Sequence, residues 1–332
     1  MAKGSSVEAI LDQDLLIVDP HHHLWGAPHP VYRVQEFARD LGSGHRVAAT
    51  VHVECSQAYR EGGPSLLQPV GETEHIASLT AKDICESLAM PGLCAGIVGF
   101  ADFRVGAAVR EVLHAHIAAA EGRFRGIRHT APSDTSPEVA EVLRIKPPGL
   151  LLDRWFREGF AELAPLQLSF DAWVCHTQLD DVTNLARAFP DTTIILNHTG
   201  GPVGIGAYAG KRDAVFAVWS AGIQTLAREP NVLVKLGGLG MKLGGFGFEH
   251  QPVLPGSVAL AKAWQPYIET CIQAFGPARC MFESNFPVDG LSCSYATLWN
   301  AFKRLAAGYG DKERRDLFSG TALRAYRIRL DG

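Results

Sequence analysis

Eight short apolar runs alternate with longer amphipathic stretches along the 332 residues, and this alternation constrains the fold more than any other feature. The runs predict strands at about 15–20, 46–54, 93–100, 124–129, 169–175, 192–197, 231–236 and 279–284. Apolar residues at helical spacing predict helices between them, in the sets Ile76, Leu79, Ile84, Leu88; Leu179, Val182, Leu185, Phe189; and Trp264, Ile268, Cys271, Phe275. Residues 1–332 are therefore predicted to form one α/β domain, a (β/α)8 barrel, with functional groups at the C-terminal strand ends. A doubly wound sheet is the alternative, although no Gly-rich nucleotide-binding loop follows any strand.

The first run ends in three consecutive histidines. Side chains alternate across a strand, so His21 and His23 are expected on one face and His22 on the other. Two imidazoles together at a strand end can hold a metal ion or polarise a substrate oxygen. A polar turn or a tag fragment is the alternative reading, but a tag normally lies at a terminus in a longer run.

Polar side chains recur at the other strand ends, as a barrel active site requires. A single histidine at a strand end is more often a hydrogen-bonded structural residue than a ligand, and it is the repetition that predicts a site. The candidates from the second strand onward are His52, Glu54, Arg128, His129, His176, His198, Lys235, Glu283 and Asn285.

Charge and cysteine content exclude several classes of protein. The 31 basic and 35 acidic residues give a net charge of −4, and no basic block is present, so no nucleic-acid partner is expected. No run of about 18 apolar residues and no signal sequence is visible, which predicts a cytoplasmic chain that does not cross a membrane. The seven dispersed cysteines lack a Cys-x-x-Cys pair and are expected to be reduced thiols.

Five motifs occur in the chain in an order that resembles the amidohydrolase superfamily, in its branch of TIM-barrel lactonases related to L-fuconolactonase and 2-pyrone-4,6-dicarboxylate lactonase. The motifs are Asp19-x-His21-x-His23-Leu24-Trp25, Gly126-Ile127-Arg128, His176-Thr-Gln-Leu179, His198-Thr-Gly-Gly-Pro202 and Ser284-Asn285-Phe286-Pro287-Val288. The resemblance implies that the reacting carbonyl is surrounded by His21, His23, His176, His198 and residue 285. Some members of this branch use a divalent metal and others do not.

Residue 285 departs from the family pattern, in which an aspartate binds metal and accepts a proton from water. Asn285 is neutral and has no useful basicity. We therefore expect either no metal or one weakly bound zinc or manganese ion, with His21, His23 and His198 as its ligands. Glu54 or Glu283 could replace the missing base, although an ion pair with an arginine or lysine is an equal alternative for each.

Two loops are expected to border the site. The Gly-rich segment 237–257 follows the seventh strand and is expected to cover the mouth, with His250 as a candidate substrate contact. Tyr59 and Arg60 follow the second strand. Arg128, with Lys235 or Arg60, could clamp a substrate carboxylate through paired hydrogen bonds.

The predicted function is hydrolysis of a small lactone derived from a sugar acid or a carboxylated ring. His21, His23 and His198 are expected to polarise the carbonyl, with or without a metal, and His176, Glu54 or Glu283 to take the proton of the attacking water. A decarboxylase or hydratase of an unsaturated or aromatic acid is one alternative. A barrel that only binds a small acid is another, because fold alone does not fix function. A homodimer is compatible with the sequence.

Overall fold

The computed structural model describes residues 4–5, 8–27, 30–90 and 92–330. Its centre is an eight-stranded parallel sheet in which each strand pairs with its neighbour in the chain. Every predicted strand is present, generally shorter than predicted. The strands are β2 (Ile17–His22), β3 (Val47–Val53), β4 (Gly96–Gly99), β5 (Phe124–Arg128), β6 (Ser169–Ala172), β7 (Ile194–Leu196), β8 (Val232–Leu236) and β10 (Cys280–Phe282).

The sheet closes into a barrel where the first strand meets the segment after the last. The backbone N–H of Asn285 donates to the carbonyl of His21 at 2.9 Å, and that of His23 donates to the carbonyl of Phe286 at 2.8 Å. A parallel bridge also joins His22 to Phe286. The fold is the predicted single-domain (β/α)8 barrel, and closure brings residue 285 beside the histidines of β2.

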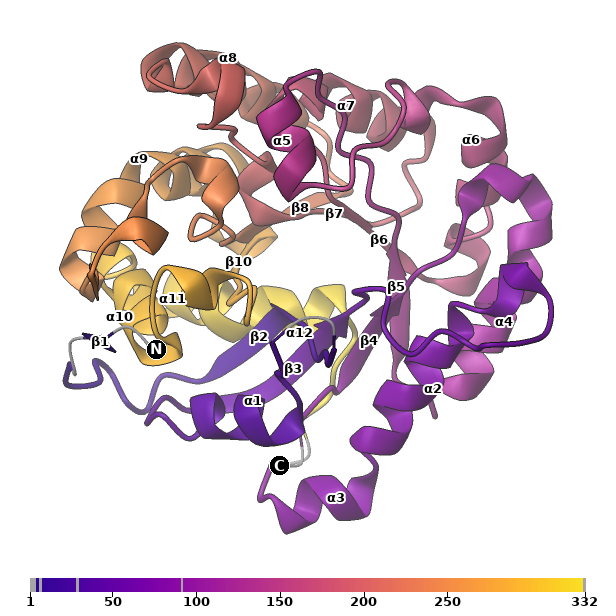
Figure 1. The fold of residues 1–332 in the computed structure, drawn as a ribbon, viewed down its shortest axis with the longest axis horizontal. Coiled ribbons are helices and arrows are strands. Elements are labelled where there is room, and N and C mark those ends of the chain that lie inside the picture. The colour runs from indigo at the N-terminus through magenta and orange to yellow at the C-terminus, as the bar shows by residue number, and fades with distance from the viewer. Residues whose placement is uncertain (1–3, 6–7, 28–29, 91, 331–332) are drawn as a thin grey trace.

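Helices surround the ring of strands (Figure 1). They are α1 (Val34–Leu41), α2 (Val70–Leu79), α3 (Lys82–Ser87), α4 (Val109–Ala119), α5 (Pro137–Val142), α6 (Arg154–Phe160), α7 (Leu179–Ala188), α8 (Arg212–Leu226), α9 (Ser257–Phe275), α10 (Tyr295–Leu305), α11 (Asp311–Arg315) and α12 (Thr321–Ala325). The last two predicted apolar sets lie on α7 and α9. The first predicted set is divided between α2 and α3. The α2 helix ends at Leu79, just before Thr80, whose hydroxyl donates to the Ile76 carbonyl at 2.7 Å.

The barrel interior has an apolar layer and a polar layer. Aliphatic side chains such as Val51, Val98 and Ile195 pack together with Tyr326, which follows α12. The Tyr326 hydroxyl donates to both carboxylate oxygens of Asp171, at 2.9 and 3.1 Å. The residue after α12 therefore packs against the barrel interior and supports a buried acid on β6.

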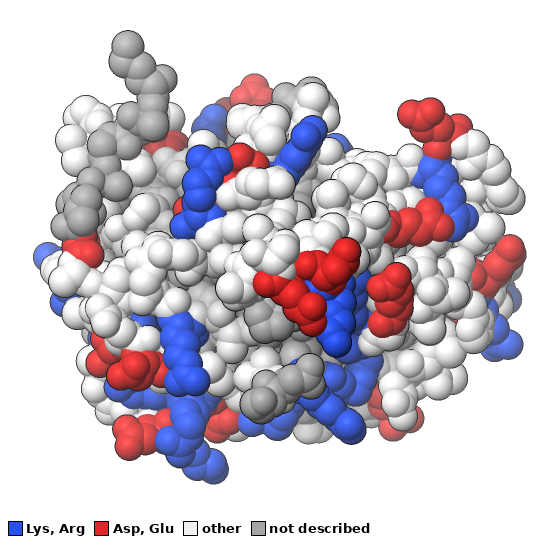
Figure 2. All heavy atoms as spheres, turned by 90° about the horizontal axis from the view of Figure 1, so that it is seen from below, with Lys and Arg blue, Asp and Glu red and all other residues white. Residues whose placement is uncertain are grey.

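The remaining features lie outside the barrel wall. A two-stranded parallel sheet joins β1 (Gly4–Ser5) to β9 (Val253–Leu254). Basic and acidic side chains are interspersed on the face drawn in Figure 2. Within the described ranges no helix combines the length and apolar character needed to cross a membrane. All seven cysteines are free thiols.

Candidate active site

A cavity of about 480 Å³ opens at the C-terminal ends of the barrel strands. Its volume is in the range of ordinary small-molecule sites. The predicted site residues that line it are His23, Glu54, Tyr59, Arg128, His198 and Asn285. They follow different strands, as expected for a barrel whose strands end around one opening.

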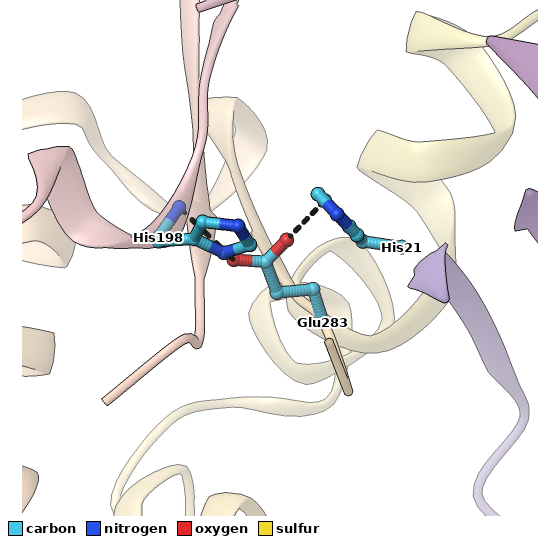
Figure 3. Close-up of side chains that lie close together, drawn as sticks. All are labelled: His21, His198 and Glu283. Carbon is cyan, nitrogen blue, oxygen red and sulfur yellow. Dashed lines mark hydrogen bonds and ion pairs between the residues drawn. The ribbon is translucent and has the colours of Figure 1, made fainter. Parts of the chain in front are cut away.

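His198 is held by Glu283 (Figure 3). Its Nδ1 lies 2.7 Å from Glu283 Oε1, which also accepts the His198 backbone N–H at 3.0 Å. A carboxylate only accepts hydrogen bonds, so the proton of neutral His198 is on Nδ1 and Nε2 carries the lone pair. No hydrogen bond to Nε2 is present among the described residues. The pair therefore presents an oriented imidazole base to the cavity.

His21 and His23 form a chain of hydrogen bonds that starts at Lys235. The Lys235 ammonium, which can only donate, lies 3.2 Å from His21 Nδ1, and the Arg128 guanidinium, also only a donor, lies 3.3 Å from His21 Nε2. That nitrogen lies 3.3 Å from His23 Nε2, and His23 Nδ1 donates to the Val53 carbonyl at 2.7 Å. Burial, with Lys235 beside His21 and Arg128 beside His23, holds the pKa of both imidazoles well below the usual value. Both rings are thus neutral at pH 7.

The second oxygen of Glu283 faces His21 (Figure 3). Glu283 Oε2 lies 2.9 Å from His21 Nδ1, the ring nitrogen that also faces Lys235 Nζ at 3.2 Å. Within the described structure Oε2 has no hydrogen-bond partner, and Glu283 is completely buried. His21 and His198 therefore flank the two oxygens of the buried Glu283 carboxylate.

Arg128 and Glu54 form a buried ion pair at the cavity wall. Arg128 Nε donates to Glu54 Oε1 at 2.8 Å, and its NH2 group donates to the Glu54 carbonyl. Burial raises the pKa of the Glu54 carboxyl, while Arg128 opposes that shift. Glu54 thus adopts the ion-pair arrangement rather than facing the cavity as a free base. The NH1 group of Arg128 has no carboxylate partner in the described structure.

Asn285 is held in a left-handed backbone conformation, with φ of 52°. Its side-chain amide donates to Asp289 Oδ1 at 2.8 Å, and Asp289 Oδ2 accepts the Gly240 N–H at 3.0 Å. Because the amide nitrogen is engaged, the Asn285 carbonyl oxygen remains as an acceptor at the cavity. The Asp289 carboxyl is completely buried, and burial raises its pKa to about 8. Asp289 therefore connects the segment after β10 to the Gly-rich loop.

The Gly-rich loop lies against the site, but its aromatic residues do not face it. Gly238 has φ of 69°, and a Cβ there would lie 2.5 Å from His198 Cβ, so only glycine fits. Phe246 and Phe248 stack at 5.7 Å, and Phe248 packs against Trp264 of α9. Met241 is the loop residue that lines the cavity.

His22 points away from His21 and His23, as strand alternation predicts. Its Nε2 lies 3.0 Å from Thr50 Oγ1, and its ring stacks on Phe37 at 4.1 Å. The His21 ring, in contrast, lies 4.6 Å from that of His198. His22 therefore belongs to the packing between β2 and the surrounding helices.

Several predicted site residues lie apart from this cluster. His176 Nδ1 accepts the Val203 N–H at 3.4 Å and its ring packs on Tyr208. Arg60 pairs with Glu74 at 3.0 Å. The His250 side chain is 73% exposed. His21, Lys235 and Glu283 are completely buried behind the residues that line the cavity.

The sequence analysis missed four residues that the cavity or its support uses. Trp173 lines the wall, with its ring 4.7 Å from that of His198. Arg144 and Lys146 line the cavity from a loop after α5, and a loop has no periodic pattern from which their position could be predicted. Asp171 on β6 accepts from Lys235 at 2.6 Å. Asp171 could have been found as the single acid in an apolar strand, because a buried carboxylate needs a partner.

Comparison with known proteins identifies the family. The amidohydrolase family model matches residues 18–328. The chain belongs to the amidohydrolase family. An uncharacterised protein of Sinorhizobium fredii, y4mH, is 34% identical over 342 residues, which cover 95% of this chain and 99% of that protein. An L-fucono-1,5-lactonase of Burkholderia multivorans is 26% identical over 329 residues, which cover 94% of this chain and 96% of that protein.

Solved amidohydrolase structures share the fold. One from Burkholderia multivorans with bound zinc has a TM-score of 0.71 and 24% identity, and the match covers 95% of this chain and 100% of that one. At the level of the family, the lactonases among the curated relatives support a lactone hydrolase. The chain is an enzyme of the amidohydrolase type.

Because an amidohydrolase relative holds zinc, we asked whether these residues fit a divalent metal. Candidate ligand atoms of His21, His198 and Glu283 lie within 4.8 Å of one another. However, Lys235 Nζ lies 3.2 Å from His21 Nδ1, and Arg128 NH1 lies 3.3 Å from its Nε2. A divalent ion about 4 Å from one ammonium is repelled by roughly 8 kcal/mol at an effective dielectric constant of about 20. The residues as they stand do not fit a resident divalent metal.

A second group with metal-binding side chains lies beside the cavity and is also already engaged. It consists of His52, Cys55 and Glu72. The Glu72 carboxylate accepts the backbone N–H groups of Cys55 at 2.8 Å and Ser56 at 3.2 Å. Glu72 therefore fixes the loop that carries Glu54 and Tyr59 to the cavity.

Proposed function

We propose that the cavity hydrolyses a small lactone that carries a carboxylate. The observation that supports this most directly is the His198–Glu283 pair, whose 2.7 Å hydrogen bond leaves His198 Nε2 as a base at a cavity of substrate size. An imidazole oriented by a carboxylate is a common arrangement for moving a proton to or from water. Hydrolysis of a cyclic ester requires this step.

In the proposed reaction, His198 Nε2 accepts a proton from the attacking water as its oxygen bonds to the lactone carbonyl carbon. Arg128 stabilises the negative charge that develops on the carbonyl oxygen, because its NH1 group can donate there. The tetrahedral intermediate then expels the ring oxygen. Protonated His198 returns the proton to that oxygen, and the product is an open-chain hydroxy acid.

The charge at the cavity mouth supports a carboxylated substrate. Arg144 and Lys146 line the opening, and neither belongs to an ion pair within the described structure. Arg144 donates to the Ser56 hydroxyl at 3.1 Å, which holds the guanidinium at the rim. With Arg128 paired to Glu54, the two rim cations add positive charge that an anionic substrate would neutralise.

A panel of neutral sugar lactones and carboxylated lactones tests the proposed function. We expect hydrolysis of carboxylated lactones to hydroxy acids that have gained one water, as followed by mass spectrometry. Release of carbon dioxide would instead indicate a decarboxylase. Saturable binding of the acids without turnover would indicate a binding protein.

Replacing Arg144 or Lys146 with glutamine should raise KM for carboxylated lactones by about 10-fold, the cost of losing one hydrogen bond to a charged group. The value of kcat should change little, because neither residue reaches the reacting carbonyl. Arg60→Gln is the matched control, since Arg60 pairs with Glu74 and does not line the cavity. Equal effects on neutral and carboxylated lactones would contradict the assignment of the rim cations to a carboxylate.

A further inference from the structure

Apolar side chains line much of the cavity at the C-terminal strand ends. The largest of them lie on five different loops or loop ends, and they are Trp25, Phe100, Val142, Leu143, Trp173 and Met241. Trp173 is buried, whereas the other five are only half-buried. Apolar surface that remains accessible at a cavity favours a ligand that covers it with apolar surface of its own.

Two tryptophan rings lie beside the histidines of the site. The ring of Trp173 lies 4.7 Å from that of His198, at an interplanar angle of 80°. The ring of Trp25 is parallel to that of His23, with the centroids 5.7 Å apart and 6° between the planes. A substrate ring that reaches His198 therefore lies next to aromatic surface, which favours a flat aromatic partner through stacked or edge-to-face contacts.

The charged groups of the cavity are mainly hydrogen-bond donors. Arg128, Arg144 and Lys146 line it, and their side chains can only donate. Glu54 is the single acid among the lining residues that the structure describes, and its carboxylate accepts from Arg128 at 2.8 Å. Each hydroxyl group of a sugar has a proton to donate, so a sugar site needs acceptors that this cavity uses elsewhere.

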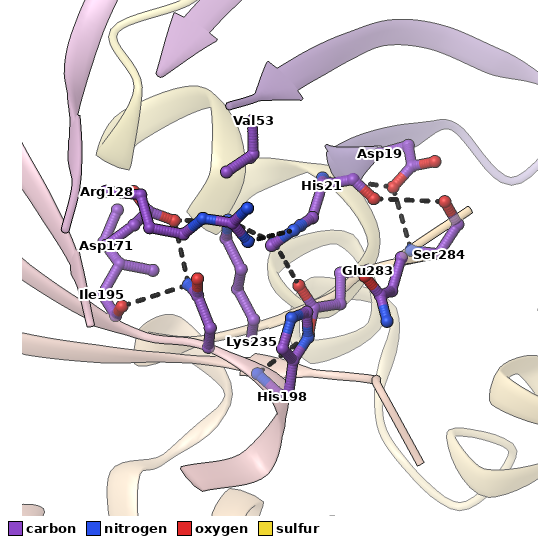
Figure 4. A network of polar contacts seen from close by, with 12 residues as sticks. Asp19, His21, Val53, Arg128, Asp171, Ile195, His198, Lys235, Glu283 and Ser284 are labelled. Atoms are coloured by element: carbon purple, nitrogen blue, oxygen red, sulfur yellow. Dashed lines mark hydrogen bonds and ion pairs between the residues drawn. The ribbon is translucent and has the colours of Figure 1, made fainter. Parts of the chain in front are cut away.

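The acids behind the cavity wall are engaged as well (Figure 4). Asp171 accepts from Lys235 at 2.6 Å, and Glu283 lies between His21 and His198. Both carboxylates are completely buried, and neither lines the cavity. Among the described residues, no free carboxylate is therefore available to the hydroxyl groups of a bound sugar, whereas several donors face a carboxylate or a carbonyl oxygen.

We propose that the substrate is a carboxylated lactone that carries an aromatic ring where a sugar lactone carries hydroxyl groups. Its carboxylate binds at the rim cations, its lactone carbonyl lies at His198 and Arg128, and its aromatic surface covers the apolar wall. Leu143 and Val142 are then specificity-determining residues, since they contact the part of the substrate that does not react. This inference rests on the proposed function and narrows its substrate class.

Two lactones with five-membered rings test this substrate class. Phthalide-3-carboxylate and D-glucaro-1,4-lactone each carry one carboxylate, but the first has a fused benzene ring and the second has hydroxyl groups. We expect kcat/KM of the parent chain to be about 100-fold higher for the phthalide, because aromatic surface gains by burial and unpaired hydroxyl groups lose hydrogen bonds to water. Equal values, or a preference for the glucarolactone, would overturn the proposal.

Binding of two acids that cannot be hydrolysed separates this inference from the proposed function. Naphthalene-2-carboxylate and D-gluconate are titrated calorimetrically into the parent chain. The dissociation constant of the aromatic acid should be lower on the order of 30-fold. If this preference holds while neither lactone is hydrolysed, the proposed hydrolysis fails and the aromatic preference of the cavity stands. Equal affinities would overturn the aromatic preference, whether or not the lactones react.

Leu143→Asn tests the apolar wall directly. The change should lower kcat/KM for the phthalide by about 10-fold and leave the value for the glucarolactone unchanged, because only the aromatic substrate loses an apolar contact. Val142→Thr keeps the branched shape of the side chain and should act in the same direction, so the test does not depend on the folding of one variant. Equal losses for both lactones in both variants would contradict the assignment.

Leu152→Asn is the matched control. Leu152 is 47% exposed and does not line the cavity, so the same substitution should leave both values of kcat/KM unchanged. A selective loss of phthalide hydrolysis in this control would mean that the effect of Leu143→Asn does not arise at the cavity wall. The specificity role of Leu143 would then be wrong.

Discussion

Replacing His198 with glutamine is expected to lower kcat for lactone hydrolysis by about 1000-fold, as found for the loss of a general base. Glutamine keeps a polar side chain of similar length but cannot accept a proton from water at neutral pH. KM should change much less than kcat, because the rim cations and Arg128 remain. Both kcat and KM are measured from the rate of hydrolysis of the lactone that the parent chain hydrolyses fastest in the panel.

Two further variants separate the role of His198 from that of its neighbours. Glu283→Gln weakens the orientation of the imidazole and should lower kcat on the order of 100-fold, with circular dichroism as the check on folding. His176→Gln distinguishes His198 from His176, another histidine that the family resemblance implies. His176 contacts Val203 and Tyr208 rather than Glu283, so this change should have little effect on kcat. A large loss for His176→Gln with a small loss for His198→Gln would reassign the base.

The barrel and the strand-end positions were predictable because both follow from local periodicity. Apolar runs fixed where strands occur, and side-chain alternation correctly separated His22 from His21 and His23. Parallel strands that close into a barrel must gather their C-terminal ends, which is why Arg128, His198 and Asn285 meet around one cavity. These conclusions need no knowledge of loop conformation.

The partners of the charged groups were not predictable in the same way. Each pair joins residues far apart in the chain, such as Lys235 with Asp171, and its geometry depends on barrel closure. Loop direction is equally hidden in the sequence. His176 and His250 follow strands as expected, yet one turns toward Tyr208 and the other toward solvent. The neighbours of the two candidate bases could likewise not be read from the sequence: Glu54 pairs with Arg128, and Glu283 lies against His21 and His198.

Replacing Asp289 with asparagine is expected to remove a loss of stability that the natural chain suffers as pH rises. Burial raises the pKa of Asp289 to about 8, above the value of about 4 for an exposed aspartate in the unfolded chain. The folded state thus holds its proton more tightly, and the stability this gives is complete below about pH 4 and is lost as pH rises through about 8. The difference between variant and parent should change by up to roughly 5 kcal/mol over this range.

Urea denaturation of both chains at several pH values measures this difference. The acids and thiols near Asp289, chiefly Glu283 and Cys293, are common to parent and variant, so the comparison isolates Asp289. Asparagine has nearly the same shape, and its carbonyl oxygen can still accept the Gly240 N–H. Parallel stability curves for the two chains would mean that Asp289 does not titrate in this range.

Asn285→Asp changes the other member of the Asn285–Asp289 pair, and it adds a carboxylate where Asp289→Asn removes one. It sets a second carboxylate against Asp289 at the 2.8 Å spacing now occupied by the amide, and two such groups cannot both ionise. The folded variant must keep one proton at a pH where the parent has lost it, so its stability should continue to fall above about pH 8, where the parent levels off. The double change Asn285→Asp with Asp289→Asn restores one amide and one carboxylate and should recover the parent curve. If the single and double variants behave alike, the interaction between residues 285 and 289 does not control this region.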